Sequence, residues 1–140
     1  MTLATDPIAC NAAAVAAYHE SHDPSCLRQD VVFVDMASGL RWEGREAVAG
    51  MLAWLYHVAF EARVEDARLT VGLDGVALEA TFTGRHLAEF AGVPGTGRDV
   101  RVPLAIFYDL AEGQISGARI HFGVATFLAQ VGGGGSSQPA

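Results

Sequence analysis

The sequence contains no lysine: all nine basic residues are arginine, set against 16 acidic residues for a formal net charge of −7. Without a lysine amine the chain cannot form a Schiff base, and it lacks the lysine of a phosphate-binding P-loop. The acidic balance argues against nucleic acid as a partner, because neutralising phosphates requires a basic surface. Any chemistry must therefore rest on His, Asp, Glu, Tyr and Arg.

Cysteine and long apolar runs are also scarce. Cys10 and Cys26 stand alone, without the CxxC spacing of a zinc site or the pattern of a disulfide framework. No run approaches the ~20 apolar residues that cross a bilayer, and the N-terminus lacks the basic region and apolar core of a signal peptide. We expect a cytoplasmic protein that uses no metal or cofactor and binds no membrane.

The sequence does contain enough apolar residues for a core, since 51% of its 140 residues are hydrophobic. That length is typical of one domain. We assign residues 1–131 to a single domain and 132–140 (GGGGSSQPA) to a flexible tail.

Capping residues and periodicity predict the elements. Asp6-Pro7 and Asp23-Pro24 are cap–proline signals that open a helix to about Ser21 and a short helix to about Gln29. An apolar stripe of period 3.6 predicts a third helix over about 45–60. The expected strands span about 31–37, 40–43, 62–71, 76–90, 99–108 and 114–124. Helices followed by strands with short connections predict an α+β fold, with helices packed on one face of a curved antiparallel sheet.

The segment Thr81–Pro103, TFTGRHLAEFAGVPGTGRDVRVP, resembles the signature of SnoaL-like polyketide cyclases, a family in the nuclear transport factor 2-like superfamily. Upstream, DVVF at 30–33 and GREAV at 44–48 are similar to the superfamily's strand and to the entry of its third helix. The resemblance implies a cone-shaped barrel of three N-terminal helices in a strongly curved antiparallel sheet, with an apolar pocket inside. It also implies a homodimer formed through the sheet.

The resemblance further implies a cofactor-independent cyclase that acts on a small apolar or aromatic, polyketide-like carbonyl substrate in secondary metabolism. Such cyclases close a ring by aldol condensation: a carboxylate removes a proton beside a carbonyl, and hydrogen-bond donors stabilise the enolate. The aspartate that they carry near the end of the last strand corresponds here to Gly123. The base must therefore be sought elsewhere.

His121 is the nearest substitute, since it lies two residues before Gly123 on the same face of the expected strand. Periodicity alone directs Ile120 and Phe122 into the core and leaves Arg119 and His121 outward. The resemblance instead directs the Gly123 face into the pocket. The two arguments conflict, so His121 stays a candidate acid or base and Arg119 a candidate substrate contact.

Asp35 and Tyr18 offer a second solution. Their segments are similar to those of ketosteroid isomerases in the same superfamily, which would make Asp35 the base and Tyr18 the donor to an enolate. The second acidic donor of those enzymes would fall near Leu104, where this sequence has none. The alternative is that Asp35 caps the turn at Ser38-Gly39 and Tyr18 packs beside Val15.

We expect a further set of side chains to shape the pocket: Trp54, Phe82, His86, Phe107 and Phe122. For His86 the alternative is a structural role in bracing the loop that follows it. His19 and His22 are three residues apart and lack HExxH spacing, so we interpret them as a solvated helix end rather than a metal site.

Two rival functions stay open. One is a ketosteroid-isomerase-like double-bond isomerase that uses Asp35 as its base. The other is a non-catalytic small-molecule binding protein of the same fold.

Overall fold

The computed structural model describes residues 6–132, so of the tail predicted over 132–140 only Gly132 falls within the described residues. The helical elements are α1 (Pro7–Ser21), the 3₁₀ turn η1 (Pro24–Cys26), α2 (Arg45–Trp54), the π-helical turn η2 (Leu55–Ala59) and α3 (Val124–Val131). The strands are β1 (Leu27–Asp35), β2 (Arg41–Glu43), β3 (Phe60–Val71), β4 (Gly75–His86), β5 (Asp99–Ala111) and β6 (Gln114–Phe122). Within residues 6–132, no helix is long and apolar enough to cross a membrane.

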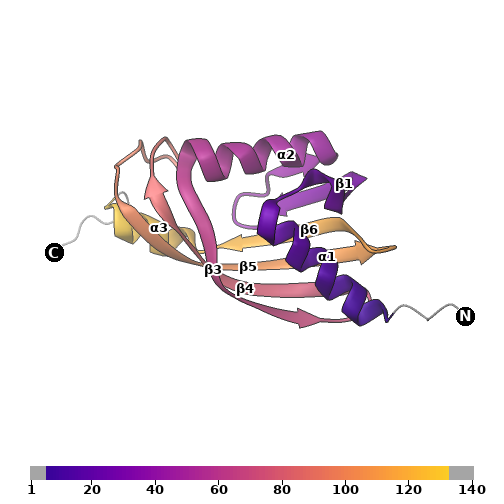
Figure 1. The fold of residues 1–140 in the computed structure, drawn as a ribbon. Helices are drawn as coiled ribbons and strands as arrows, with labels where there is room; N and C mark the ends of the chain where they lie inside the picture. The colour runs from indigo at the N-terminus through magenta and orange to yellow at the C-terminus, as the bar shows by residue number, and fades with distance from the viewer. Residues whose placement is uncertain (1–5, 133–140) are drawn as a thin grey trace, which may run out of the picture.

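The six strands form one curved, unclosed sheet in the order β2-β1-β6-β5-β4-β3. Neighbouring strands are antiparallel except β1 and β6, which run parallel. Helix α1 contacts β3, β4 and β6, while α2 contacts β1 and β2. In Figure 1, α1 crosses in front of the strands and α2 runs along their upper side. The predicted α+β architecture, with helices packed against a strongly curved sheet, is confirmed.

Helix α1 begins and ends as its sequence predicts. The Asp6 side chain accepts a hydrogen bond from the Ile8 N–H, and Pro7 occupies the first turn. At the other end His22 adopts the left-handed conformation, with φ of 53°, and its N–H closes on the Tyr18 carbonyl. This tight ending turns the chain back toward the sheet.

The first strand starts earlier than predicted. The structure has one 3₁₀ turn, Pro24–Cys26, where the sequence predicts a helix to about Gln29, and β1 begins at Leu27 rather than Val31. Leu27 is fully buried and pairs with Ile115 of β6. Pairing with a distant strand overrides the local helix signal here, as tertiary contacts commonly do.

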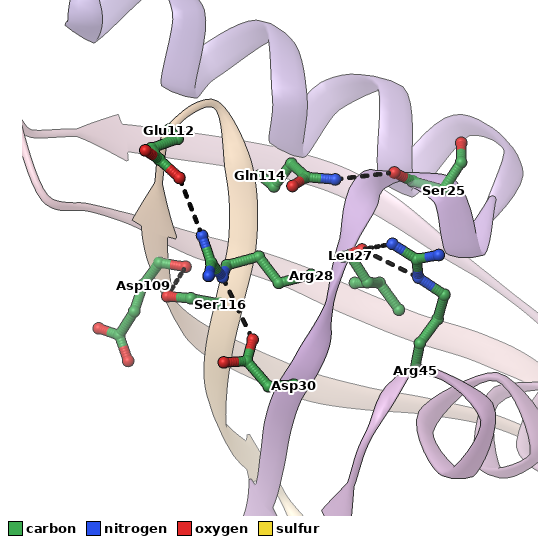
Figure 2. Close-up of polar contacts among 9 residues, drawn as sticks. All are labelled: Ser25, Leu27, Arg28, Asp30, Arg45, Asp109, Glu112, Gln114 and Ser116. Carbon is green, nitrogen blue, oxygen red and sulfur yellow. Dashed lines mark hydrogen bonds and ion pairs between the residues drawn. The ribbon is translucent and has the colours of Figure 1, made fainter.

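Polar side chains fasten the same region, as Figure 2 shows. The Arg45 guanidinium, at the start of α2, donates to the Leu27 carbonyl at 3.1 Å from Nε and 2.7 Å from its terminal nitrogen. The Gln114 amide, at the start of β6, donates to the Ser25 carbonyl at 3.4 Å. Together these bonds hold α2, η1 and β6 around the first residues of β1.

The predicted helix over 45–60 changes form before its end. Helix α2 stops at Trp54, and η2 continues it with wider turns, in which the Phe60 N–H donates to the Leu55 carbonyl. Phe60 is fully buried and opens β3 by pairing with His86. The π-helical turn thus carries the chain directly from a helix into the sheet.

Among the described residues the last element is a helix, which begins at Val124, where the sequence predicts the last strand to end. Strand β6 stops at Phe122, and Gly123 is the N-cap residue of α3. Helix α3 packs against β5. Helix α3 is therefore an additional, C-terminal helix that neither the sequence nor the resemblance predicts (Figure 1). The Gly123 N–H donates to the Pro103 carbonyl at 3.0 Å, and the Phe127 N–H donates to the Gly123 carbonyl at 3.0 Å.

Gly123 is also closely packed. A Cβ at this position would lie 2.8 Å from Cγ and 3.2 Å from the carbonyl oxygen of Pro103. The proline ring cannot swing away as a flexible side chain would. The structure has no room for an aspartate where the resemblance expects one.

We expect Gly123→Ala to lower the free energy of unfolding by roughly 1–3 kcal/mol, the range for overpacked sites. Gly50→Ala is the matched control, because a Cβ on Gly50 in α2 would meet nothing within 4 Å. That control should gain about 0.5–1 kcal/mol, since alanine replaces glycine inside a helix. Urea unfolding measures both, and equal effects of the two substitutions would contradict the steric account.

Candidate active site

A cavity lies between the helices and the concave face of the sheet. Helix α1, α2 with η2, and strands β1, β4, β5 and β6 all contribute to its wall. Most of the lining is aromatic or aliphatic: Phe33, Trp42, Met51, Leu52, Trp54, Leu55, Phe82, Phe90, Leu104, Ile106, Ile120, Phe122 and Val124. The polar members are Tyr18, His19, His22, Asp35, Tyr56 and Tyr108. Its volume is about 90 Å³.

Strand register decides which side chains reach this cavity. Across the sheet, Asp35 pairs with Ile120, which pairs with Ile106. Tyr108 lies two residues after Ile106 on β5, and it pairs with Ala118 of β6, which pairs with Phe33 of β1. Side chains two apart point to the same face, so Asp35 and Tyr108 share the concave face two strands apart. Standard strand spacings place their Cα atoms about 12 Å from each other.

Asp35 lies at the end of β1, half-buried, on the cavity wall. One carboxylate oxygen accepts from the Ala37 N–H at 3.1 Å, and the other accepts from the Ser38 hydroxyl at 2.8 Å. The side chain therefore caps the turn, as one of the two sequence interpretations holds, and also faces the cavity. Among the lining residues in the described chain it is the one carboxylate.

Tyr18 is buried in α1 and surrounded by aromatic rings. Its ring lies 6.4 Å from that of Phe33 and 5.9 Å from that of Tyr108, both edge-on. Burial, and then the neighbouring Tyr56 and Cys26, raise the pKa of the Tyr18 phenol well above its ordinary value. At neutral pH Tyr18 is a neutral O–H donor.

His19, next to Tyr18, also turns toward the cavity. Its Nε2 and the Tyr108 hydroxyl share a hydrogen bond of 2.5 Å. Burial, and secondarily the charge of His22, lowers the pKa of His19 to about 4, so its imidazole is neutral at pH 7. Burial, and then His57, lowers the pKa of His22 as well. The ring of His22 lies 4.5 Å from that of Tyr56.

The interpretation of His19 and His22 as a solvated helix end is therefore wrong. Asn11, Val15 and Tyr18 form the buried stripe of α1, and His22 continues their helical spacing. Tyr108 is similarly the last member of the inward series on β5 that begins at Val100. The helical spacing that includes His22 and the alternation that includes Tyr108 can both be read from the sequence. Neither pattern identifies a functional residue until the cavity is known.

The indole of Trp54, at the end of α2, is 41% exposed and also lines the cavity. It stacks on Phe90 with ring centroids 6.1 Å apart and planes 28° from parallel. Because Trp54 is exposed and Phe90 is half-buried, the stacked pair lies where the lining meets solvent, at the mouth of the cavity. Trp54, Phe82 and Phe122 thus lie on the wall as predicted.

The other face of β6 carries residues that the sequence placed at the site. His121 is exposed, outside the cavity lining, and its ring meets that of Phe107 edge-on at 5.5 Å. Phe107 is 42% exposed, and Arg119 pairs with the Asp109 carboxylate at 2.8 Å. Periodicity predicts this outward placement correctly. The roles that the resemblance gave His121 and Arg119, and the expected place of Phe107 in the pocket wall, are wrong, because Ile120 and Phe122 face inward and none of these three residues lines the cavity.

His86 is fully buried but does not line the cavity. Its Nδ1 accepts from the Thr96 N–H at 3.3 Å and is 3.0 Å from the Thr96 hydroxyl. Backbone bonds from His86 to Arg98 and from Gly97 to His86 close the same loop. The structure gives His86 the bracing role that the sequence left as the alternative to a pocket contact.

Comparisons with known proteins agree on the family and the fold. The model of the SnoaL-like polyketide cyclase family matches residues 9–131. A candidate polyketide cyclase from Xanthomonas campestris is 22% identical, with a TM-score of 0.80 over 90% of this chain and 99% of that one. A candidate SnoaL-like polyketide cyclase from Jannaschia is 22% identical, with a TM-score of 0.79 over 99% and 100%.

A third structure extends the comparison. A Catenulispora acidiphila protein with a ketosteroid isomerase-like fold, solved in complex with trimethylamine, is 23% identical, with a TM-score of 0.69 over 91% of this chain and 96% of that one. A search of curated proteins gives no match. At these identities the structures establish the shared fold.

The buried imidazole of His19 makes stability depend on pH. The unfolded chain takes up this proton near pH 6.5 and the folded chain only near pH 4. Between these values the unfolded state binds more protons, so the free energy of unfolding falls as the pH falls. His22 acts in the same direction.

We expect the wild type to lose roughly 1–3 kcal/mol more than His19→Gln across this window. Thermal or urea unfolding at a series of pH values measures the difference. Leu73→Gln, at an exposed position in the turn between β3 and β4, is the control for a surface substitution and should keep the wild-type slope. An unchanged slope in His19→Gln would contradict the assignment.

Proposed function

Because the chain belongs to the SnoaL-like polyketide cyclase family, we propose that it is a cofactor-independent enzyme of the cyclase or isomerase type, with Asp35 as base and Tyr18 as enolate donor. One observation carries the proposal. A largely apolar cavity holds a single carboxylate, among the residues described, and a separate group of neutral donors: Tyr18 and His19 from α1, Tyr56 from η2 and Tyr108 from β5. Enolate chemistry requires both kinds of group.

In the proposed reaction Asp35 removes a proton from the carbon beside a substrate carbonyl. Electron density then moves onto the carbonyl oxygen, where the Tyr18 O–H donates to the developing enolate. In a cyclisation the enolate carbon attacks a second carbonyl of the same substrate, and the alkoxide that forms takes the proton from Asp35, which regenerates the base. In an isomerisation Asp35 returns the proton at another carbon. The Ala37 N–H and the Ser38 hydroxyl hold the Asp35 carboxylate in place.

We propose a flat, apolar, polyketide-like substrate of secondary metabolism and a cytoplasmic location, and the lining supports the apolar character of this substrate. Rings of Phe33, Phe82, Phe90 and Phe122 offer faces and edges on which such a molecule packs. The cavity of about 90 Å³ is smaller than the ~300–1,000 Å³ of common ligand sites. A substrate of several rings would require Trp54 and Phe90 to move apart at the mouth.

The Catenulispora neighbour supports the isomerase alternative only through its fold. A non-catalytic binding protein is the other alternative, because the aromatic lining alone would hold an apolar ligand.

We also propose that the protein is a homodimer formed through the outer face of the sheet. Phe107 and His121 pack together there, and Phe107 leaves 42% of its surface exposed. An exposed aromatic ring in the middle of a sheet is a typical interface anchor. A second copy related by a two-fold axis would bring the same residues together.

Proton exchange on a simple ketone tests the enzyme without the natural substrate. In D₂O the wild type should accelerate deuterium uptake at the α-carbon of 2-tetralone, followed by NMR. Asp35→Asn should lower this rate by ~10²–10⁴-fold, and Tyr18→Phe by ~10²–10³-fold. His121→Asn, on the outer face, should retain it.

The outcomes separate the three functions. Bound 2-tetralone without acceleration of exchange would favour the binding protein. Conversion of a 3-oxo-Δ5 steroid to its conjugated isomer, lost in Asp35→Asn, would favour the isomerase. Full exchange in the Asp35→Asn/Tyr18→Phe double variant would overturn the assignment of both residues.

For the dimer, light scattering after size exclusion should show twice the chain mass for the wild type and a single mass for Phe107→Glu. The charged side chain cannot be desolvated in the interface. Leu73→Glu is the matched control, since Leu73 is 65% exposed in the turn between β3 and β4. A monomeric wild type, or a dimeric Phe107→Glu, would overturn the proposal.

A further inference from the structure

The hydrogen bond between His19 and Tyr108 joins two cavity residues that the proposed mechanism does not yet use. Tyr108 is 1% exposed, and its oxygen lies 2.5 Å from Nε2 of His19. The second nitrogen of His19, Nδ1, is sealed from solvent and has no hydrogen-bond partner among residues 6–132. The pair therefore has one spare donor, and its position depends on which nitrogen carries the proton.

Two tautomers are possible for the neutral ring. If Nδ1 carries the proton, Tyr108 donates to Nε2 and a sealed N–H stays without an acceptor. If Nε2 carries the proton, it donates to the Tyr108 oxygen and leaves the phenolic hydrogen free to rotate. Buried N–H groups without acceptors are rare because of their desolvation cost. The second arrangement leaves the buried Tyr108 O–H equally unpaired until an oxygen in the cavity accepts its hydrogen, and such an acceptor reaches Tyr108, which lines the cavity, so a bound oxyanion selects the proton on Nε2.

Tyr108 stays protonated beside this imidazole. Burial, and then the neighbouring Tyr18 and Tyr56, raise the pKa of its phenol well above the ordinary value. Its ring lies 5.9 Å from the ring of Tyr18. Two neutral phenols thus stand side by side in a setting that disfavours ionisation of either one.

We propose that Tyr108 donates a second hydrogen bond to the substrate oxyanion beside Tyr18, and that His19 is a positioning residue that holds the Tyr108 oxygen through Nε2–H. This inference rests on the proposed enolate chemistry and supplies the second donor that is missing near Leu104. The ligand class is an oxygen anion on a flat conjugated skeleton, an enolate or a phenolate. A donor that itself accepts a hydrogen bond is strengthened by it, so His19 acts through Tyr108.

4-Nitrophenol tests the pair by binding, independently of any reaction. Its phenolate absorbs visible light, so absorbance measures the ionised fraction. At a pH just below the pKa of the free probe, a site with two donors should bind the phenolate and thereby increase this fraction. The titration uses the full chain with Asp35→Asn, which removes the lining carboxylate and its repulsion. Tyr108→Phe in this background should weaken phenolate binding by ~10-fold or more.

The His19 variants distinguish positioning from packing. His19→Leu should lose most of the same affinity, and His19→Gln should recover part of it because its amide N–H can reach the Tyr108 oxygen. Adding His19→Leu to Tyr108→Phe should cost nothing further, since His19 acts through the hydroxyl that is already gone. His57→Leu and His57→Gln, at an exposed histidine, are the matched controls.

Unchanged phenolate binding in Tyr108→Phe would overturn the inference, and so would additive losses in the double variant. If His19→Leu does not fold, Tyr108→Phe and His19→Gln still decide it. Failure of the enzyme proposal looks different: phenolate binding would depend on Tyr108 while 2-tetralone exchange is absent. A third outcome is that 2-tetralone exchange requires Asp35, while Tyr108→Phe changes neither this exchange nor phenolate binding. The enzyme proposal would then stand, and the proposal of Tyr108 as second donor would be wrong.

Discussion

The parallel pairing of β1 with β6 is the constraint on which the site depends. Its register puts Asp35 level with Ile120 and Phe33 level with Ala118. A shift of β1 by one residue would turn Asp35 and Phe33 to the opposite face. Such a shift would also break the bonds from Arg45 to Leu27 and from Gln114 to Ser25 (Figure 2). Residues far apart in sequence thereby secure the distance between the Asp35 carboxylate and the Tyr108 phenol.

Much of this arrangement can be predicted from the sequence, because local rules govern it. Asp6-Pro7 opens α1 where capping chemistry predicts, and β5 alternates between buried and exposed residues from Asp99 to Tyr108. The same alternation predicts that Ile120 and Phe122 face inward. The resemblance, applied at Gly123, predicts the opposite. Period two is a direct consequence of strand geometry and so proved the better guide.

Other features could not be predicted, because distant contacts govern them. Nothing local indicates that Leu27 pairs with Ile115, or that a helix begins after Gly123. The placement of His19 depends on the fold of β5, since Tyr108 meets it from a position 89 residues away. A histidine near a helix end looks solvated until the sheet that covers it is known.

The contact between Gly123 and Pro103 has an evolutionary consequence. A single substitution to aspartate at position 123 would collide with the proline ring, so an acid can be accommodated there only together with a change on β5. An aspartate at position 123 without the change on β5 would lower the stability of the fold before it could serve as an acid or base. Lineages that share this contact are therefore confined to finding their acids and bases elsewhere on the concave wall.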